Sequence, residues 1–312
     1  MTMVFNVPID AKMSVGFPGY LVLSPNTIWK GNYMTTPTTT RASITRNIVE
    51  NIPDIDQGMP IWARRTNPIV RRQLKAHWRV FPPQVYPILK TYLILSAVMA
   101  TTYLIDYLFL FILTILMAGM LLMPIAFYMY VKILASIISD SSWAMVEEFQ
   151  NGTFSLLRST PFSVREIILS KITASVWRRM DALDMVMTVA VFLGMPVISA
   201  FYLVRWSPGD APLVTQGLTI LVFGVSLIRL PLEMFFASSL AAMMGTMTRM
   251  RSTAFSSTVV LLFFYFLMIN LLRLLPLSWP MQLVVDAVLP IALPLLFIWG
   301  SLKVTEYAAL RE

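Results

Sequence analysis

Few side chains in this 312-residue sequence could carry out chemistry. The chain has no Cys and a single His, His77. Without thiolates or several imidazoles, structural zinc, haem ligation and Cys or Ser–His nucleophilic catalysis lose their usual groups. The sequence also has no G-x-x-x-x-G-K-[ST] phosphate loop of the kind that binds nucleoside triphosphates. We therefore predict no catalytic residue, no metal site and no cofactor in this chain.

Four carboxylates could bind Mg²⁺ at a membrane surface: Glu147, Glu148, Asp181 and Asp184. They are the basis of one alternative function, a membrane-embedded lipid-modifying enzyme. These carboxylates form no dense motif, however, and no nucleophile or general base accompanies them. A second alternative is a non-transporting membrane scaffold, which would have partners but no nucleotide-dependent conformational change.

Charged residues also interrupt the apolar part of the sequence. Arg229 and Glu233 are four residues apart, so on a helix they share a face and can pair, which lessens the cost of burying either charge. Such a pair could line a substrate path or act as a gate, or it could be a structural pair near Pro231. For Asp286 we expect a solvated position near the outer mouth, with a role in translocation as the alternative.

The composition indicates an integral membrane protein. Hydrophobic residues make up 57% of the chain and charged residues 13%, and the mean hydropathy is +0.71. The net charge is +8, but no residue cluster resembles a nucleic-acid-binding motif. We therefore predict an all-α, polytopic membrane protein whose partners include the lipid bilayer but no nucleic acid.

About 20 apolar residues are needed to cross about 30 Å of hydrocarbon. By this measure we predict six transmembrane helices, near residues 85–105, 107–131, 185–204, 211–248, 253–272 and 282–301. The fourth stretch is longer than one crossing requires, so it must tilt, kink near Pro231 or project into the cytosol. It also contains a row of small residues, which permits close helix packing, either internally or against a second copy: Ser238, Ala241, Ala242 and Gly245.

The distribution of Lys and Arg orients these crossings. The segment before residue 82, the insert between the second and third spans, the fourth-to-fifth connection and the C-terminal tail together hold nineteen of them. The three opposite connections hold only Arg205 and Arg273. Since basic residues in short loops stay on the cytoplasmic side, we predict cytosolic termini and a cytosolic insert at residues 137–181, in a plasma (cell inner) membrane.

The N-terminal residues, 1–66, hold no continuous apolar run and are expected to form a mostly irregular cytosolic tail without a signal peptide. The six-span membrane domain then covers residues 67–312. A helix is predicted to begin there, with Asn67 as N-cap and Pro68 in the first position. Its basic and aromatic residues fit an amphipathic helix lying in the membrane interface, or a basic helix packed on a protein neighbour: Arg71, Arg72, Lys75 and Trp78.

The insert shows a sequence of helix stops and starts. A helix reaching Gln150 should end at Gly152, because glycine adopts the left-handed conformation at little cost. Thr153 could cap a short helix that presents Phe154, Leu156 and Leu157 as apolar residues at its tip, and Thr160-Pro161 ends it. Ser163 and Glu166 have the spacing of a capping box that starts the next helix, through Lys171.

These residues resemble a segment of the permeases of ABC transporters of the second exporter type. The matching pattern is Glu147 or Glu148, Gly152-Thr153, Leu157, Thr160-Pro161, Ser163, Glu166 and Lys171. In that family the segment lies between the second and third spans and includes the coupling helix. The "NPIVRRQL" at Asn67 resembles the entry to the family's interfacial helix, although Gln73 stands where Glu is usual.

The resemblance implies a permease subunit of an energy-coupled exporter. Its insert would contact separate ABC ATPase subunits, which would hold ATP and Mg²⁺, and a second permease copy or homologue would complete a dimer. The resemblance implies nothing about residues 1–66 or about the identity of the substrate. A well-capped structural loop with no docking role is the alternative reading of the insert.

Overall fold

The computed structural model describes residues 58–64, 66–74, 85–101, 106–205, 212–275 and 277–311, and every regular element in these ranges is a helix. This confirms the all-helical fold class. The chain divides into two units, Met1–Ile52 and Pro53–Glu312, of which the second contains all the described residues. Of the predicted tail, residues 1–57 and Arg65 lie outside the described part. Its described end forms a short 3-10 turn, η1 (Ile61–Ala63), which packs against α7 (Val164–Trp177).

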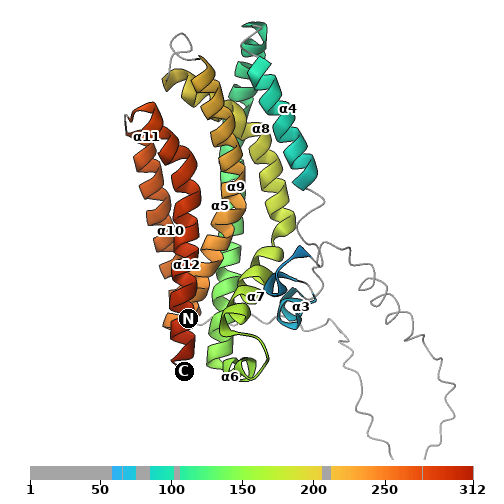
Figure 1. The fold of residues 1–312 in the computed structure, drawn as a ribbon, viewed down its shortest axis with the longest axis vertical. Coiled ribbons are helices and arrows are strands. Elements are labelled where there is room, and N and C mark those ends of the chain that lie inside the picture. Colours follow the sequence, from blue (N-terminus) through green and yellow to red (C-terminus); the bar gives the residue numbers. More distant parts are fainter. Residues whose placement is uncertain are drawn as a thin grey trace, which may run out of the picture. The chain divides into compact units, whose positions relative to one another are not determined.

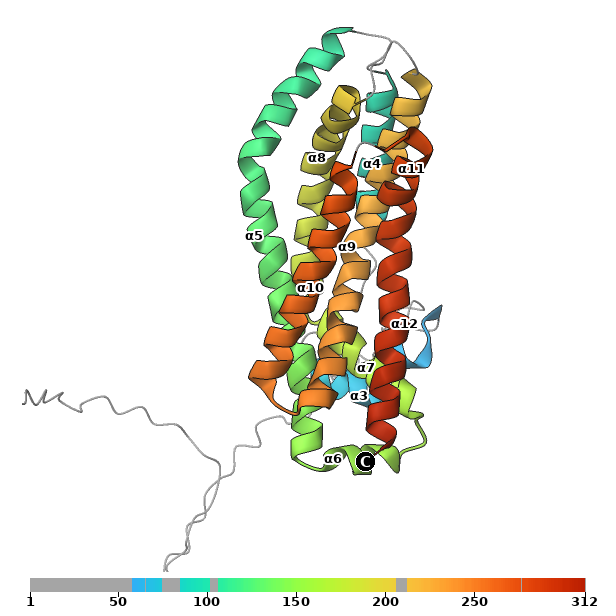
Figure 2. The same ribbon diagram turned by 90° about the vertical axis from the view of Figure 1, so that its left-hand side faces the viewer.

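The second unit is a bundle of long helices (Figure 1). Its members are α4 (Val85–Thr101), α5 (Asp106–Gln150), α8 (Met180–Arg205), α9 (Pro212–Thr248), α10 (Arg251–Leu274) and α12 (Leu289–Leu310), the last preceded by α11 (Trp279–Leu283) and the π-turn η2 (Val284–Val288). Helix α9 packs against α5, α8, α10 and α12, so it forms the centre of the bundle. The short helices α3 (Pro68–Leu74) and α6 (Thr153–Arg158) lie with α7 at the end of the bundle opposite α11 (Figure 2).

Four helices among the described residues are long and apolar enough to cross a membrane: Met123–Gln150, Gly217–Thr248, Arg251–Leu274 and Trp279–Leu310. Many of their large apolar side chains face outward, for example Phe263 on α10 and Trp299 on α12, which are 62% and 60% exposed. Lipid tails accept such a surface, whereas water penalises it. The coarse prediction of a membrane protein therefore agrees with the fold, while α4 and α8 are not among these four helices.

Helix α5 is longer than the sequence indicated. We predicted a span ending near residue 131 and a separate helix within the insert, but α5 is one helix of 45 residues that spans about 68 Å. The physical reason is that no glycine or proline lies between residue 131 and Asn151, so no residue in this stretch breaks the helix. Helix α9 is likewise continuous through Pro231, so this proline does not divide the long apolar stretch into two helices.

The row of small residues on α9 packs inside the bundle. A Cβ added to Gly245 would lie 3.0 Å from the carbonyl oxygen of Ser142 on α5, so only glycine fits there without a shift. The hydroxyl of Ser238 lies 2.6 Å from that of Ser141 on α5 and 2.8 Å from that of Ser175 on α7, and all three side chains are buried. Of the two uses left open for this row, the structure shows internal packing.

Candidate functional site

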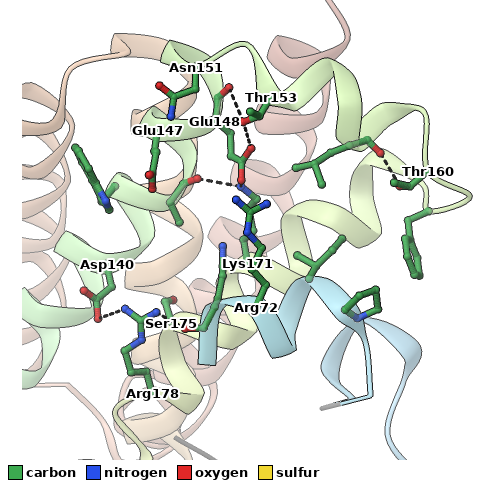
Figure 3. Close-up of a pocket in the computed structure, with 17 residues that line it drawn as sticks. Arg72, Asp140, Glu147, Glu148, Asn151, Thr153, Thr160, Lys171, Ser175 and Arg178 are labelled. Atoms are coloured by element: carbon green, nitrogen blue, oxygen red, sulfur yellow. Dashed lines mark hydrogen bonds and ion pairs between the residues drawn. The ribbon is translucent and has the colours of Figure 1, made fainter. Parts of the chain in front are cut away.

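The turn after α5 brings the site together. The amide of Asn151 still donates to the carbonyl of Glu147, at 3.0 Å, and Gly152 then has a φ of 66°. This left-handed conformation strains any residue with a Cβ, so the predicted stop at Gly152 is confirmed. The chain reverses here, and α6 and α7 return along the end of α5 (Figure 3).

Helix α6 begins and ends near the predicted places. It begins at Thr153, but the N-cap position is held by Gly152 and makes no side-chain hydrogen bond. The prediction that Thr153 caps this helix is therefore wrong, because its hydroxyl donates to the carboxylate of Glu148 instead. The helix ends at Arg158, just before the turn that contains Thr160 and Pro161, and the Thr160 hydroxyl donates to the carbonyl of Leu157.

The capping box at the start of α7 is confirmed. The amide of Glu166 donates to the Ser163 hydroxyl at 3.2 Å, and the Ser163 amide donates to the Glu166 carboxylate at 2.9 Å. These two bonds satisfy amide groups that a helix N-terminus otherwise leaves unpaired. They fix the point at which α7 begins and therefore which of its side chains face α5.

Lys171 is the charged group at the centre of the site. Its ammonium lies 3.0 Å from the Glu148 carboxylate and donates to the carbonyl of Ala144 at 2.9 Å, while its side chain is only 2% exposed. Burial lowers the pKa of Lys171, and the adjacent Glu148 carboxylate opposes this shift without cancelling it. With the Thr153 hydroxyl on the same carboxylate, the pair connects α5, α6 and α7.

Asn67 attaches helix α3 to the insert. Its side-chain oxygen accepts from the amide of Ile69 at 2.9 Å, which confirms the predicted N-cap, and Pro68 is the first residue of α3. The other side of the same amide group donates to the Ser170 hydroxyl of α7 at 3.0 Å. Asn67 is buried, so this contact is part of the packed interior and not of a surface.

The described part of α3 packs its apolar side chains against protein. Val70 and Leu74 are buried in the same cluster as Ala174 and Trp177 of α7, while the side chains of Arg71 and Arg72 are exposed. This is the packing expected of the second interpretation, a basic helix on a protein neighbour. Lys75 and Trp78, which also carried the membrane-interface interpretation, lie outside the described residues.

A groove of about 550 Å³ lies between α3, the end of α5, α6 and α7 (Figure 3). It joins two segments that the sequence analysis treated separately. The predicted residues that line it are Pro68, Arg72, Glu147, Glu148, Thr153, Leu157, Thr160 and Lys171. Exposed charges of both signs, Arg72 and Glu147, stand on its walls. The groove therefore presents charges of both signs to its surroundings.

Several residues of the groove were missed by the sequence analysis. They are Ile69, Asp140, Trp143, Ala144, Phe162, Ser175 and Arg178. Asp140 accepts from Arg179 at 3.1 Å and lies 3.6 Å from Arg178, so it ties the end of α7 to α5. A signal was available, because Asp140 is the only acidic residue between Asp106 and Glu147. Its partners could not be identified without the fold.

The apolar tip differs from the prediction. Phe154 is only 3% exposed, because its ring stacks on that of Phe149 with the centroids 4.7 Å apart. Leu157 is half-buried. Leu156 is 68% exposed and is the apolar side chain that α6 presents to its surroundings.

Arg229 and Glu233 form the ion pair that their spacing predicted, with side chains 12% and 3% exposed. The hydroxyl of Tyr130 on α5 donates to the second carboxylate oxygen of Glu233, and the Arg229 guanidinium lies 6.0 Å from the ring centre of Phe266 on α10. The cluster therefore joins α5, α9 and α10. None of its residues lines the groove at α6.

Asp286 is not solvated, so that prediction is wrong. Its side chain is 3% exposed, lies 2.9 Å from the Arg273 guanidinium and accepts from the Gln282 amide at 2.7 Å. Gln282 belongs to α11 and Arg273 to the end of α10, so the short connection between these helices folds both side chains over the carboxylate. A buried carboxylate needs such partners.

The carboxylates considered for Mg²⁺ do not converge. Within the described ranges, no three His, Cys, Asp or Glu side chains come close enough together to hold a metal ion. Glu148 is paired with Lys171, and Glu147 is exposed on the groove. Comparison of the chain with models of known protein families, with curated proteins and with solved structures gave no match.

Proposed function

We propose that this chain is the membrane permease subunit of an ATP-driven ABC exporter, coupled to a separate ATPase subunit through the insert around α6. The observation that carries the proposal is the groove at α6. Its walls are built from both of the segments that resemble the family, the start of α3 and the Glu147-to-Lys171 insert. Their joint position at one end of the bundle fits a docking surface for a soluble partner.

In this proposal the chain crosses the membrane six times, with α4 and α8 added to the four helices of sufficient length and hydropathy. Helix α8 has 26 residues and is about 39 Å long, which with tilt suits a bilayer of about 30 Å, whereas the 17 residues of α4 reach about 26 Å and need local thinning of the bilayer. The termini and the insert face the cytosol, because that side then carries nineteen basic residues against two. The membrane is the plasma (cell inner) membrane.

The ATPase partner supplies the chemistry that this sequence lacks. It binds ATP and Mg²⁺, and its conformational change is transmitted to the bundle through α6 and α7. The buried Lys171–Glu148 pair and the Asn67–Ser170 hydrogen bond make the insert rigid enough to pass on a displacement. A second permease copy or homologue completes the transport path.

Co-purification tests the proposed complex. The tagged chain is isolated from its own organism after mild cross-linking, and its partners are identified by mass spectrometry. We expect an ATPase with a phosphate loop, and we expect Leu156→Glu to reduce its recovery at least tenfold, because a charge replaces the exposed apolar residue of α6. Recovery is measured against the amount of tagged chain in the membrane fraction.

Leu310→Glu is the matched control, since Leu310 is an exposed apolar residue, 51% exposed, on α12 and not on α6. It should leave recovery of the ATPase unchanged. The proposal is wrong if no phosphate-loop ATPase is recovered with the unaltered chain. The docking role of α6 is wrong if Leu156→Glu retains the ATPase in full.

A further inference from the structure

A second cleft, of about 600 Å³, lies between α7, α9 and α12. It uses the opposite face of α7 from the groove described above. Leu169, Ile172 and Thr173 face the cleft, whereas Lys171 and Ser175 face the groove. This division follows from the 3.6-residue period of the helix. The two cavities are therefore separate, and the cleft is not used by the proposed docking of an ATPase.

The walls of the cleft are mostly apolar. Leu169 and Ile172 of α7, Leu232 and Phe235 of α9, and Ile298 and Leu302 of α12 supply them. Helices α9 and α12 are among those long and apolar enough to cross a membrane. The cleft thus lies between two candidate membrane spans, and its volume is in the range of known small-molecule sites.

The charged residues of the cleft lie at the start of α7. Arg165 is exposed there and forms no ion pair with another described residue. The neighbouring carboxylate of Glu166 accepts hydrogen bonds from the amide and hydroxyl of Ser163, so it is committed to the capping box. Arg165 is the charged side chain at this end that is left to attract an anion.

Thr173 is a second, independent indication of a ligand. It is fully buried and lines the cleft, and its hydroxyl has no hydrogen-bond partner among the described residues. Buried hydroxyl groups in proteins are nearly always paired, so this one calls for a partner that the chain does not provide. It lies eight residues after Arg165 on α7, about 12 Å farther along the helix axis.

We propose that this cleft binds an anionic phospholipid, with one acyl chain between α9 and α12, the phosphate at Arg165 and an ester oxygen accepting from Thr173. An acyl chain fits the apolar walls. Arg165 at one end of the cleft and the Thr173 hydroxyl farther along α7 match the order of phosphate, ester and acyl chain in such a lipid. The bound lipid fixes α7, and with it the insert, against the bundle. This inference needs only a membrane location and holds whether or not the chain belongs to an exporter.

Native mass spectrometry of the purified full-length chain tests the proposal. The protein is equilibrated in detergent with equal amounts of phosphatidylglycerol and phosphatidylcholine, and the retained lipid is counted. We expect about fivefold preference for phosphatidylglycerol, the effect of one basic side chain on an anionic lipid. Arg165→Gln should abolish this preference, and Arg158→Gln should keep it, because Arg158 is equally exposed but lies outside the cleft.

Two further variants separate the apolar and polar parts of the site. Ile298→Trp fills the cleft and should abolish retention of both lipids, while Thr173→Val should lower retention of both by a similar factor. Because Arg165→Gln changes an exposed side chain, it remains informative if Ile298→Trp does not fold. Equal retention of both lipids by the unaltered chain, or full retention by a folded Ile298→Trp variant, overturns the proposal. The proposal is also overturned if the unaltered chain is a lipid-free dimer and Ile298→Trp makes it monomeric, because a second copy of the chain then fills the cleft.

Discussion

Two of the ion pairs in this bundle are built in opposite ways. Arg229 and Glu233 lie four residues apart on α9, so one helix brings them together. Glu148 and Lys171 lie on α5 and α7 and meet only because the chain reverses at Gly152. Both pairs bind a hydroxyl group as well, from Tyr130 in the first case and from Thr153 in the second.

The difference shows what each pair can stabilise. The pair on α9 can form in any conformation in which α9 is helical, and it contacts other helices through Tyr130 of α5 and Phe266 of α10. The Glu148–Lys171 pair exists only when the insert is folded against the end of α5, so it reports on that tertiary contact directly. Variants that remove each pair in turn, and then the local features that allow the Glu148–Lys171 pair to form, test this difference.

The largest effect is expected from Glu233→Leu. It leaves the Arg229 guanidinium buried without its counter-ion, which typically costs about 3–5 kcal/mol of stability. Thermal unfolding of the purified protein in detergent measures the change. The double variant Arg229→Met with Glu233→Leu should recover most of the loss, because no charge then remains buried. Equal destabilisation by the single and double variants would contradict this account.

Lys171→Met should have a smaller effect, about 1–3 kcal/mol. Glu148 keeps the Thr153 hydroxyl and is 14% exposed, so water compensates part of the lost pairing. Limited proteolysis of α6, compared with cleavage elsewhere in the chain, locates the damage at the insert. The control is Lys171→Met with Glu148→Gln, which should restore resistance to the protease. An unchanged cleavage rate in the single variant would show that the pair does not hold the insert.

Gly152→Ala tests the reversal on which the Glu148–Lys171 pair depends. An alanine at a φ of 66° costs about 1–2 kcal/mol, although its Cβ would meet no atom within 4 Å. The same unfolding measurement gives the effect. Gly300→Ala on α12 is the matched control, because its Cβ also meets nothing and its φ is not positive, so stability should not fall. A loss of equal size in both variants would exclude backbone strain as the cause.

Ser163→Ala should give the smallest effect, about 1 kcal/mol, through loss of the cap on α7. Ser163→Thr keeps a hydroxyl in place and should retain most of the stability. Hydrogen exchange of the first-turn amides of α7 is the measurement, since those amides lose a bonding partner. If exchange there is the same in the alanine and threonine variants, the capping box does not stabilise α7.

The local features of the site could be predicted from the sequence. Gly152, the Ser163–Glu166 capping box and the Asn67 cap all act within a few residues, and each is confirmed. The Arg229–Glu233 pair was predictable for the same reason, since the helix period alone brings the side chains together. The apolar runs indicated the membrane helices, although the six crossings and their orientation remain predictions.

The remaining errors have one physical cause. Phe154 was expected at an exposed tip and Asp286 in water, but both are buried by residues from other helices, Phe149 in the first case and Arg273 in the second. A side chain's burial depends on what packs over it, and helical periodicity shows only which residues share a face. On a helix as short as α6, Phe154 and Leu156 looked equivalent until α5 covered one of them.

By itself the sequence determined that the chain is helical and apolar enough for a membrane, and that a helix stops at Gly152 and another begins after Ser163. These properties follow from hydropathy and from bonds between near neighbours. The tertiary structure alone decided that α3 and the insert share one groove and that Lys171 of α7 pairs with Glu148 of α5. It also decided that a separate cleft opens on the other face of α7. Such features arise when segments far apart in the chain pack together, and no local spacing encodes them.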